Sequence, residues 1–262
     1  MLYHLLEFLG EHYDFKGDKL YTFISFRAGV AMILSLVISL LFGGRIIKFL
    51  KALQIGETVR DLGLAGQKEK EGTPTMGGVI IIMAILIPFL LMADLTNMYS
   101  LVMILVTTWM GIIGFTDDYI KVFKKDKKGL AGKFKVLGQV VLGLIVGVVM
   151  FNSQDIKVRI GEQVATKYKY ELTDVQSSKI DTIVDVKAAL TNVPFLKKSE
   201  LDYAFFLKPF ISDEEKRQKW AWIIFIPIAI FFVTGISNGA NLTDGIDAVS
   251  YTHLTLPTIC SV

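Results

Sequence analysis

The chain of 262 residues is 52% hydrophobic and has a net charge of +3, from 28 Lys and Arg against 25 Asp and Glu. This weak positive balance gives no indication of a nucleic-acid partner, since nucleic-acid-binding domains are usually strongly basic. The single cysteine, Cys260, excludes an intrachain disulfide framework and a cysteine-based zinc site.

Charged residues are concentrated between long apolar stretches, which is the pattern of membrane-spanning helices joined by aqueous loops. A helix needs about 20 residues to cross a hydrocarbon core of roughly 30 Å. Five stretches approach that length: Tyr21–Phe42, Met76–Ala93, Tyr99–Thr116, Val136–Phe151 and Trp220–Ile236. We therefore predict an all-α, polytopic integral membrane protein with about five transmembrane helices.

The distribution of lysine and arginine predicts the orientation in the membrane. Segment 44–75 carries six of these residues and segment 117–135 carries seven, whereas segment 94–98 has none. The positive-inside rule places the two basic segments in the cytoplasm. Alternation of the spans then puts segment 152–219 outside and returns the chain to the cytoplasm after about residue 237.

Segment 152–219 is predicted to be a small extracytoplasmic insert. Ile156, Val158 and Ile160 alternate with polar residues, and the same alternation continues in 164–170 after a Gly-Glu pair. A period of two on both sides of a turn predicts a β-hairpin. The predicted organisation is a membrane region 1–151 with four helices, the insert 152–219, a fifth helix with the following loop 220–247, and a tail 248–262.

Two adjacent carboxylates, Asp117 and Asp118, directly follow the third apolar stretch. Neighbouring carboxylates at the edge of a span repel each other without a nearby cation, and ionisable residues there are candidate functional sites. Hard oxygen ligands suit Mg²⁺, which commonly binds one or two carboxylates and substrate phosphates. The alternative is a pair of solvated loop acids beside lysines.

Residues 70–78, Lys-Glu-Gly-Thr-Pro-Thr-Met-Gly-Gly, open the second apolar stretch. Proline and paired glycines in a first helical turn allow close backbone approach and expose amide donors to an anion. Lys70 and the threonine hydroxyls, including that of Thr75, add further donors. The alternative is an ordinary capped helix start whose small residues serve helix packing.

Lysines in the glycine-punctuated segment after the acid pair are candidates to face phosphates. Lys133 is the main candidate, together with Lys121 and Lys135. Phosphoryl transfer requires cations to neutralise developing charge. The alternative for any single lysine is a role in setting topology only.

A polar string follows the fifth stretch at 238–247, Asn-Gly-Ala-Asn-Leu-Thr-Asp-Gly-Ile-Asp. We interpret it as a glycine-rich turn whose Asn241, Asp244 and Asp247 could read a base and a ribose or share a metal. In isolation it could also be a simple turn or a calcium-type loop. The lysine-based topology puts all four motifs on one membrane face, which favours a single site.

In order and spacing, three of these strings resemble the polyprenyl-phosphate N-acetylhexosamine-1-phosphate transferase superfamily, and within it the phospho-N-acetylmuramoyl-pentapeptide transferase family. The strings are Gly72–Gly78, Asp117–Tyr119 and Asn241–Asp247. The resemblance implies that phospho-MurNAc-pentapeptide passes from UDP-MurNAc-pentapeptide to undecaprenyl phosphate, giving lipid I and UMP with Mg²⁺ in peptidoglycan synthesis. It also implies a bacterial inner-membrane protein whose active site faces the cytoplasm.

The resemblance assigns roles to residues of this chain. It implies that Asp117 and Asp118 are catalytic and lie near the metal. It implies substrate contacts for six further residues: Lys70, Thr75, Lys133, Asn241, Asp244 and Asp247. It leaves the oligomeric state open, a homodimer among the options.

The sequence departs from this family in two places. The insert 152–219 is longer than the short hairpin that the family implies. The family also continues past the position of Asp247 to ten spans in all, and these hold a further metal-binding aspartate and a histidine-rich loop. Residues 248–262 have no family character. We therefore expect a C-terminally truncated transferase that is inactive alone and ends in a non-native tail.

Three other functions remain as alternatives. A sister enzyme would use UDP-GlcNAc, although the Thr-Pro-Thr-Met-Gly-Gly string favours the muramoyl enzyme. A transporter, which is not an enzyme, would use the acid pair to bind an ion. A prenyltransferase usually has a third, spaced aspartate that this acid pair lacks.

Overall fold

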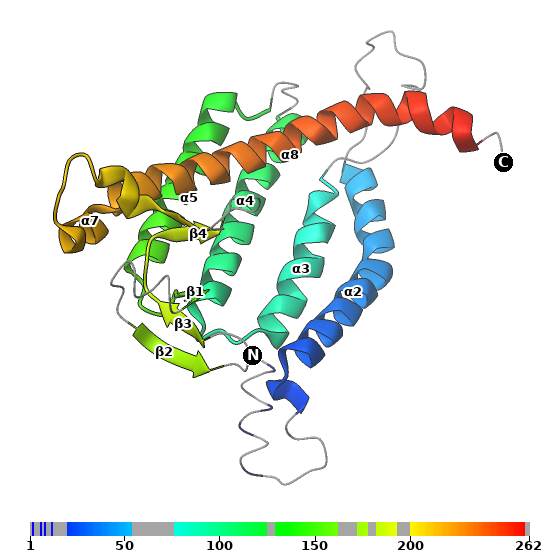
Figure 1. Ribbon diagram of the computed structural model, residues 1–262. Coiled ribbons are helices and arrows are strands. Elements are labelled where there is room, and N and C mark those ends of the chain that lie inside the picture. Colours follow the sequence, from blue (N-terminus) through cyan, green and yellow to red (C-terminus); the bar gives the residue numbers. More distant parts are fainter. Residues whose placement is uncertain are drawn as a thin grey trace. The chain divides into compact units, whose positions relative to one another are not determined.

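The computed structural model describes residues 20–53, 76–124, 129–161, 172–177, 182–192 and 200–259, with isolated positions 2, 6, 8 and 12 (Figure 1). Within the helices and strands, the side chains of 53, 172–177, 182–183, 192, 200 and 243–259 are not described. The chain forms two compact units. One comprises Met1–Gly138 with Ser237–Val262, and the other comprises Gln139–Ile236.

The first unit is built from apolar helices. A short 3₁₀ helix η1 (Leu20–Thr22) precedes α2 (Ile24–Leu53), and α3 (Gly78–Met92) and α4 (Met98–Phe123) follow. Figure 1 shows α3 between α2 and α4, and both pairs are in contact. Asn97 caps α4 by accepting a hydrogen bond from the amide of Tyr99 at 2.9 Å, which satisfies a free donor of the first turn.

Four helical segments among the described residues are long and apolar enough to cross a membrane. They are Ile24–Ala52, Met98–Phe123, Gly132–Asn152 and Glu214–Leu242. The remaining predicted span corresponds to α3, an apolar helix of 15 residues, or about 22 Å at 1.5 Å per residue. The predicted polytopic α-helical membrane protein is therefore confirmed, with four helices of full spanning length and one shorter apolar helix.

Close helix packing dominates the membrane part of the second unit. Here α5 (Gly132–Asn152) meets α8 (Trp222–Ile259) through glycines. A Cβ atom on Gly143 would lie 2.7 Å from the Cα atom of Ile230, and one on Gly147 would lie 3.3 Å from the Cβ atom of Ala229. Small residues permit this backbone approach, which supplies the van der Waals contact that holds helices together in lipid.

The insert contains two small antiparallel sheets. In the first sheet, β3 (Thr182–Val186) lies between β1 (Val158–Gly161) and β2 (Leu172–Ser177). The second sheet pairs β4 (Leu190–Asn192) with β5 (Glu200–Asp202). Ile160, Val184, Val186 and Leu190 form the buried core. The register sets Val158 opposite Val186 and Ile160 opposite Val184, so the alternating apolar residues of β1 share one face.

The predicted hairpin is only partly correct. Its first strand exists as β1, but the partner that the structure describes for β1 is β3. The predicted second strand, 164–170, lies outside the described residues. The insert does hold a hairpin, formed by β2 and β3. Alternation identifies which face of a strand is buried and does not identify the partner strand, which the buried cross-strand pairs select.

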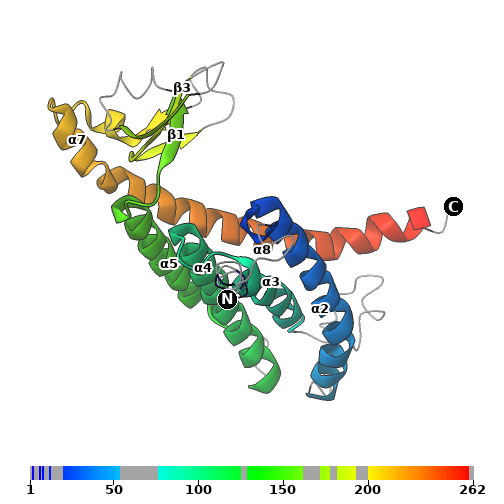
Figure 2. The ribbon, with the colours of Figure 1, turned by 90° about the horizontal axis from the view of Figure 1, so that it is seen from below.

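Lys187 joins the sheet to the membrane helix α5, and Figure 2 shows the sheet beside the end of that helix. Its ammonium donates hydrogen bonds to the carbonyls of Asn152, at 2.7 Å, and Ser153. These are free acceptors at a helix C-terminus, where a cation is favourable. Burial lowers the pKa of Lys187. On the sheet itself, the Arg159 guanidinium beside Asp185 holds the pKa of that carboxyl below its usual value.

We expect Gly143→Ala to destabilise the protein by about 1–3 kcal/mol, because the added methyl group would overlap the backbone of α8. Alanine otherwise stabilises a helix by ~1 kcal/mol relative to glycine. A loss of stability in Gly143→Ala would therefore show that the close contact between α5 and α8 exists. Thermal unfolding of the detergent-solubilised protein, followed by circular dichroism, measures it. Gly235→Ala is the matched control, since its Cβ would meet open space. Equal melting temperatures for the two variants would contradict the expectation.

Candidate carboxylate–lysine site

The acid pair lies in the last turns of α4, and its two members have different surroundings. Asp117 is 8% exposed and is the only buried charged residue among the described side chains. Asp118 is partly exposed. Successive residues of a helix point about 100° apart. One carboxylate therefore faces the turn into α5, while the other faces the start of α3.

Asp117 is surrounded by donors. One carboxylate oxygen accepts from the Lys121 ammonium at 2.6 Å. The other lies 2.9 Å from the Lys135 ammonium and accepts from the backbone amide of Leu130 at 2.8 Å. Two cations and an amide thus compensate one buried charge, which would otherwise be strongly unfavourable. The arrangement ties α4, the following turn and α5 together.

Gly129 makes this arrangement possible. Its φ is +64°, a conformation that side chains other than glycine rarely adopt. A Cβ atom there would lie 2.5 Å from Oδ1 of Asp117 and 2.7 Å from Cε of Lys121. Glycine is therefore needed both for the backbone turn and for the approach of the chain to the carboxylate.

Asp118 contacts the end of the 70–78 motif. The backbone amide of Met76 interacts with its carboxylate, and the Lys121 ammonium lies 3.8 Å away. Met76 has a φ of +67° and is 6% exposed. A positive φ in a bulky residue is uncommon, and such conformations cluster at functional sites. The strained turn therefore brings a second motif to the acid pair.

A cavity of about 330 Å³ opens beside Asp118 between α3 and α4. Its walls come from Met76 to Ile82 and from Val106 to Asp118, and Asp118 is the only charged residue among those that line it. Gly111 sets the spacing of the helices, since a Cβ there would lie 2.9 Å from Ile82. The cavity therefore combines apolar walls with one carboxylate.

The structure also locates the lysines named from the sequence. Lys121 and Lys135 hold Asp117, whereas Lys133 is exposed with its ammonium 5.4 Å from the ring centroid of Phe134. Lys135, which the sequence ranked behind Lys133, is thus the α5 residue in the described cluster. Lys70 and Thr75 lie outside the described residues.

The predicted turn at 238–247 is wrong, because α8 continues as one helix from Trp222 to Ile259. The string 238–247 contains no proline, and an isolated glycine costs a helix only about 1 kcal/mol, so an established helix can propagate through Gly239 and Gly245. Asn241 is exposed on α8, and within the described side chains it has no hydrogen bond or ion pair with the acid pair. For Asp244 and Asp247 only the helical backbone is described.

The carboxylates differ in their fitness for a metal ion. No group of three or more His, Cys, Asp or Glu side chains that could hold a metal occurs in the described part of the chain. At Asp117 a cation would have to displace a lysine from an oxygen atom. Asp118 instead faces open space, and Mg²⁺ bound through one carboxylate with phosphates and water would fit there.

Comparison with known proteins agrees with these motifs. The family model of glycosyl transferase family 4 matches residues 100–261. Signature 1 of phospho-N-acetylmuramoyl-pentapeptide-transferase matches residues 70–82. A phospho-N-acetylmuramoyl-pentapeptide-transferase of Flavobacterium psychrophilum is 50% identical over 250 residues, covering 95% of this chain and 60% of that relative.

Two further relatives carry the same name. The protein of Flavobacterium johnsoniae is 50% identical over 252 residues, with 95% of this chain and 60% of the relative covered. That of Parabacteroides distasonis is 48% identical over 250 residues, with 95% and 57% covered. The chain thus spans less than two thirds of the length of these curated relatives.

We expect Gly129→Ala to destabilise the site by about 1–2 kcal/mol from the positive φ alone, with a further loss from overlap with Asp117. The melting temperature in detergent should fall accordingly. Gly132→Ala is the control, since nothing lies within 4 Å of the added atom. If Gly129→Ala melts no lower than Gly132→Ala, the described packing around Asp117 is incorrect.

Proposed function

We propose, from the premise that the chain belongs to glycosyl transferase family 4, that it acts in the transfer of phospho-MurNAc-pentapeptide from UDP-MurNAc-pentapeptide to undecaprenyl phosphate. The products are lipid I and UMP, and the reaction serves peptidoglycan synthesis at the bacterial inner membrane. One observation carries the proposal. The matched signature, residues 70–82, contributes Met76, Gly78, Val79 and Ile82 to the cavity that Asp118 lines.

The reaction exchanges one phosphoanhydride bond for another. An oxygen atom of the lipid phosphate attacks the phosphorus atom that bears the sugar. The bond from that phosphorus to the bridging oxygen breaks, and UMP leaves with the electron pair. Because several anionic phosphates meet, positioning and charge neutralisation carry most of the catalysis. Lysines beside a carboxylate pair supply the charges that such a reaction needs.

The two aspartates take different roles in this proposal. Asp118 faces the cavity and would hold Mg²⁺, which when bound neutralises charge on the diphosphate. Asp117 already binds two ammonium groups and an amide, so it positions Lys121 and Lys135 for the incoming phosphates. The residue in contact with open space is therefore the better candidate for a direct contact with the metal and the lipid phosphate.

The remaining contacts are assigned from the resemblance alone. Lys133 is exposed near the start of α5, and we assign it to the diphosphate of the sugar nucleotide. The other substrate contacts are assigned to residues without described side-chain contacts here: Lys70, Thr75, Asn241, Asp244 and Asp247. The site would face the cytoplasm, where the nucleotide substrate is soluble.

The cavity suits the lipid substrate better than the nucleotide. Apart from Asp118 and Thr107, its lining is apolar, from residues such as Val79, Ile82 and Phe115. An isoprenoid chain gains by burying apolar surface, whereas a uridine needs several hydrogen-bonding partners. We therefore place the phosphate end of undecaprenyl phosphate near Asp118, with its chain toward the apolar walls.

Activity can be tested in a chimera that joins residues 1–247 to the matching C-terminal part of the Flavobacterium psychrophilum relative. In vesicles with undecaprenyl phosphate, we expect UMP release from UDP-MurNAc-pentapeptide. Asp118→Asn should reduce it by about 10²–10³-fold, because transition-state charge loses a fixed partner. Asp155→Asn, an exposed carboxylate of the insert, should leave the rate unchanged.

Two outcomes would overturn the proposal. One is a folded chimera that releases no UMP while the relative turns over under the same conditions. The other is UMP release from UDP-GlcNAc at the rate seen with the muramoyl substrate, which would favour the sister enzyme.

Removal of the metal gives an independent test of Asp118. We expect EDTA to abolish UMP release by the chimera and added Mg²⁺ to restore it. The reason is that the proposed Mg²⁺ is held by one carboxylate and the substrate phosphates, and EDTA removes it from them. The Mg²⁺ concentration for half-maximal rate should rise several-fold in Asp118→Glu, which keeps the charge but moves the oxygens. Full turnover in excess EDTA would rule out a role for Mg²⁺.

A further inference from the structure

The insert presents an aromatic face on the 3₁₀ helix η3 (Tyr203–Leu207) and the turn after it. This aromatic face consists of Phe205, Phe206 and Phe210, which are 59%, 47% and 84% exposed. The rings of Phe205 and Phe206 are in edge-on contact, with centroids 6.3 Å apart. Large exposed apolar patches mark contacts with proteins or membranes. The catalytic proposal gives these residues no role.

The orientation of η3 is firmly set by its other side. Tyr203, Ala204 and Leu207 are buried, and Asp202 caps the helix by accepting from the amide of Ala204 at 2.8 Å. With three residues per turn, Ala204 and Leu207 share one buried face, and Phe205 points away from that face. The exposure of Phe205 is therefore a consequence of how η3 packs. Phe206, one turn after buried Tyr203, and Phe210, in the turn after η3, are exposed as well.

Contacts of Tyr203 place η3 at the level where two membrane helices end. Its ring meets that of Phe225 edge-on with centroids 5.6 Å apart, and Phe225 lies 6.2 Å from Phe151. Phe225 is in the first turn of α8, and Phe151 is the residue before the end of α5. The Tyr203 hydroxyl also shares a hydrogen bond of 2.7 Å with Thr191, which fixes η3 to the second sheet.

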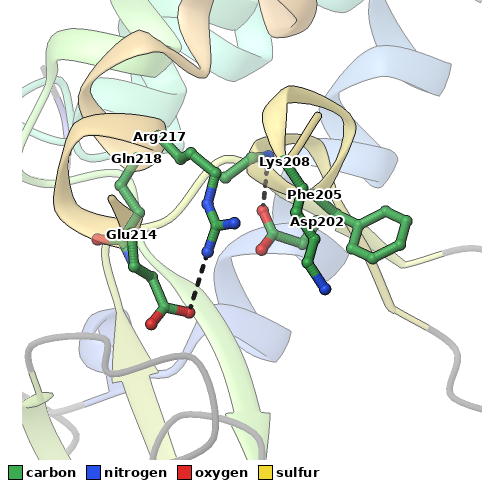
Figure 3. Close-up of a pocket in the computed structure, with 7 residues that line it drawn as sticks. Asp202, Phe205, Lys208, Glu214, Arg217 and Gln218 are labelled. Atoms are coloured by element: carbon green, nitrogen blue, oxygen red, sulfur yellow. Dashed lines mark hydrogen bonds and ion pairs between the residues drawn. The ribbon is translucent and has the colours of Figure 1, made fainter. Parts of the chain in front are cut away.

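Charged groups lie beside the aromatic face. A cavity of about 260 Å³ is lined by Phe205 together with Lys208, Arg217, Asp202 and Glu214 (Figure 3). Figure 3 shows the Phe205 ring turned away from the Arg217–Glu214 ion pair, whose closest atoms are 3.6 Å apart. Apolar rings thus lie beside a charged patch of two cations and two carboxylates, and an apolar layer next to a charged layer is the arrangement of a membrane interface.

We propose that the aromatic face is embedded in the lipid leaflet at which α5 ends and α8 begins. Its occupant is phospholipid, with acyl chains around the three phenylalanines and phosphates near exposed Lys208. Trp220 and Trp222, which are stacked and exposed, lie where the short helix α7 (Glu214–Trp220) passes into α8. Aromatic residues of this kind are usual in interfacial belts. The inference rests on the membrane helices and is independent of the catalytic proposal.

The test places an environment-sensitive fluorophore at position 210. Phe210→Cys is made in a Cys260→Ser background, which removes the only native thiol. The labelled protein is reconstituted in vesicles of phosphatidylethanolamine and phosphatidylglycerol. Spin-labelled lipids with a shallow acyl label should quench this probe at least about twofold more than a probe at Arg159→Cys, because only the aromatic face reaches lipid. Phe206→Cys gives a second reporter.

Both other outcomes overturn the proposal. A probe at 210 that iodide quenches as strongly as the probe at 159, with no effect of spin-labelled lipid, would show a water-facing surface. A probe shielded from both quenchers would show that protein, such as a second copy of the chain, covers the aromatic face. Arg159 is a suitable control because it is exposed on β1 of the same insert.

Discussion

The buried charge of Asp117 is the constraint on which the candidate site depends. A carboxylate removed from water is tolerated only with close cations and donors. Lys121 comes from the same helix, whereas Lys135 and the amide of Leu130 come from beyond the turn, so satisfying the charge fixes the turn itself. Gly129 is the local consequence, because a Cβ atom would occupy the space that the carboxylate needs.

Fixing Asp117 in this way decides what its neighbour can do. The helical step of about 100° turns Asp118 toward α3, where its carboxylate keeps a longer contact of 3.8 Å with the Lys121 ammonium. There it meets the amide of Met76, whose positive φ is held by a buried side chain. Two residues that look equivalent in the sequence thus become one that organises cations and one that faces a cavity. Their different roles follow from the different directions in which two successive residues of a helix point.

The features that the surrounding lipid and water determine were predictable from the sequence. Those that depend on side-chain packing between distant residues were not. The spans were predictable because a bilayer requires long apolar helices. The pairing of Lys135, and not Lys133, with Asp117 was not predictable. Residues two apart on a helix point about 200° apart, and only the contact with α4 selects between them. In the same way, alternation marked β1 but not its partner β3. The glycine-rich string at 238–247 suggested a turn, yet it continues α8.

The length of the insert has a physical explanation within the second unit. Its two membrane helices touch through Gly143 and Gly147. In lipid there is no hydrophobic driving force between helices, so these contacts rely on close van der Waals packing. The insert contacts both helices at their membrane-edge ends. Lys187 binds the end of α5, and Tyr203 packs against the first turn of α8. A direct connection of a few residues could join α5 to α8 but could not make contacts with the end of α5 and the start of α8 at the same time. Folded sheets supply the rigidity that keeps these two contacts in place together.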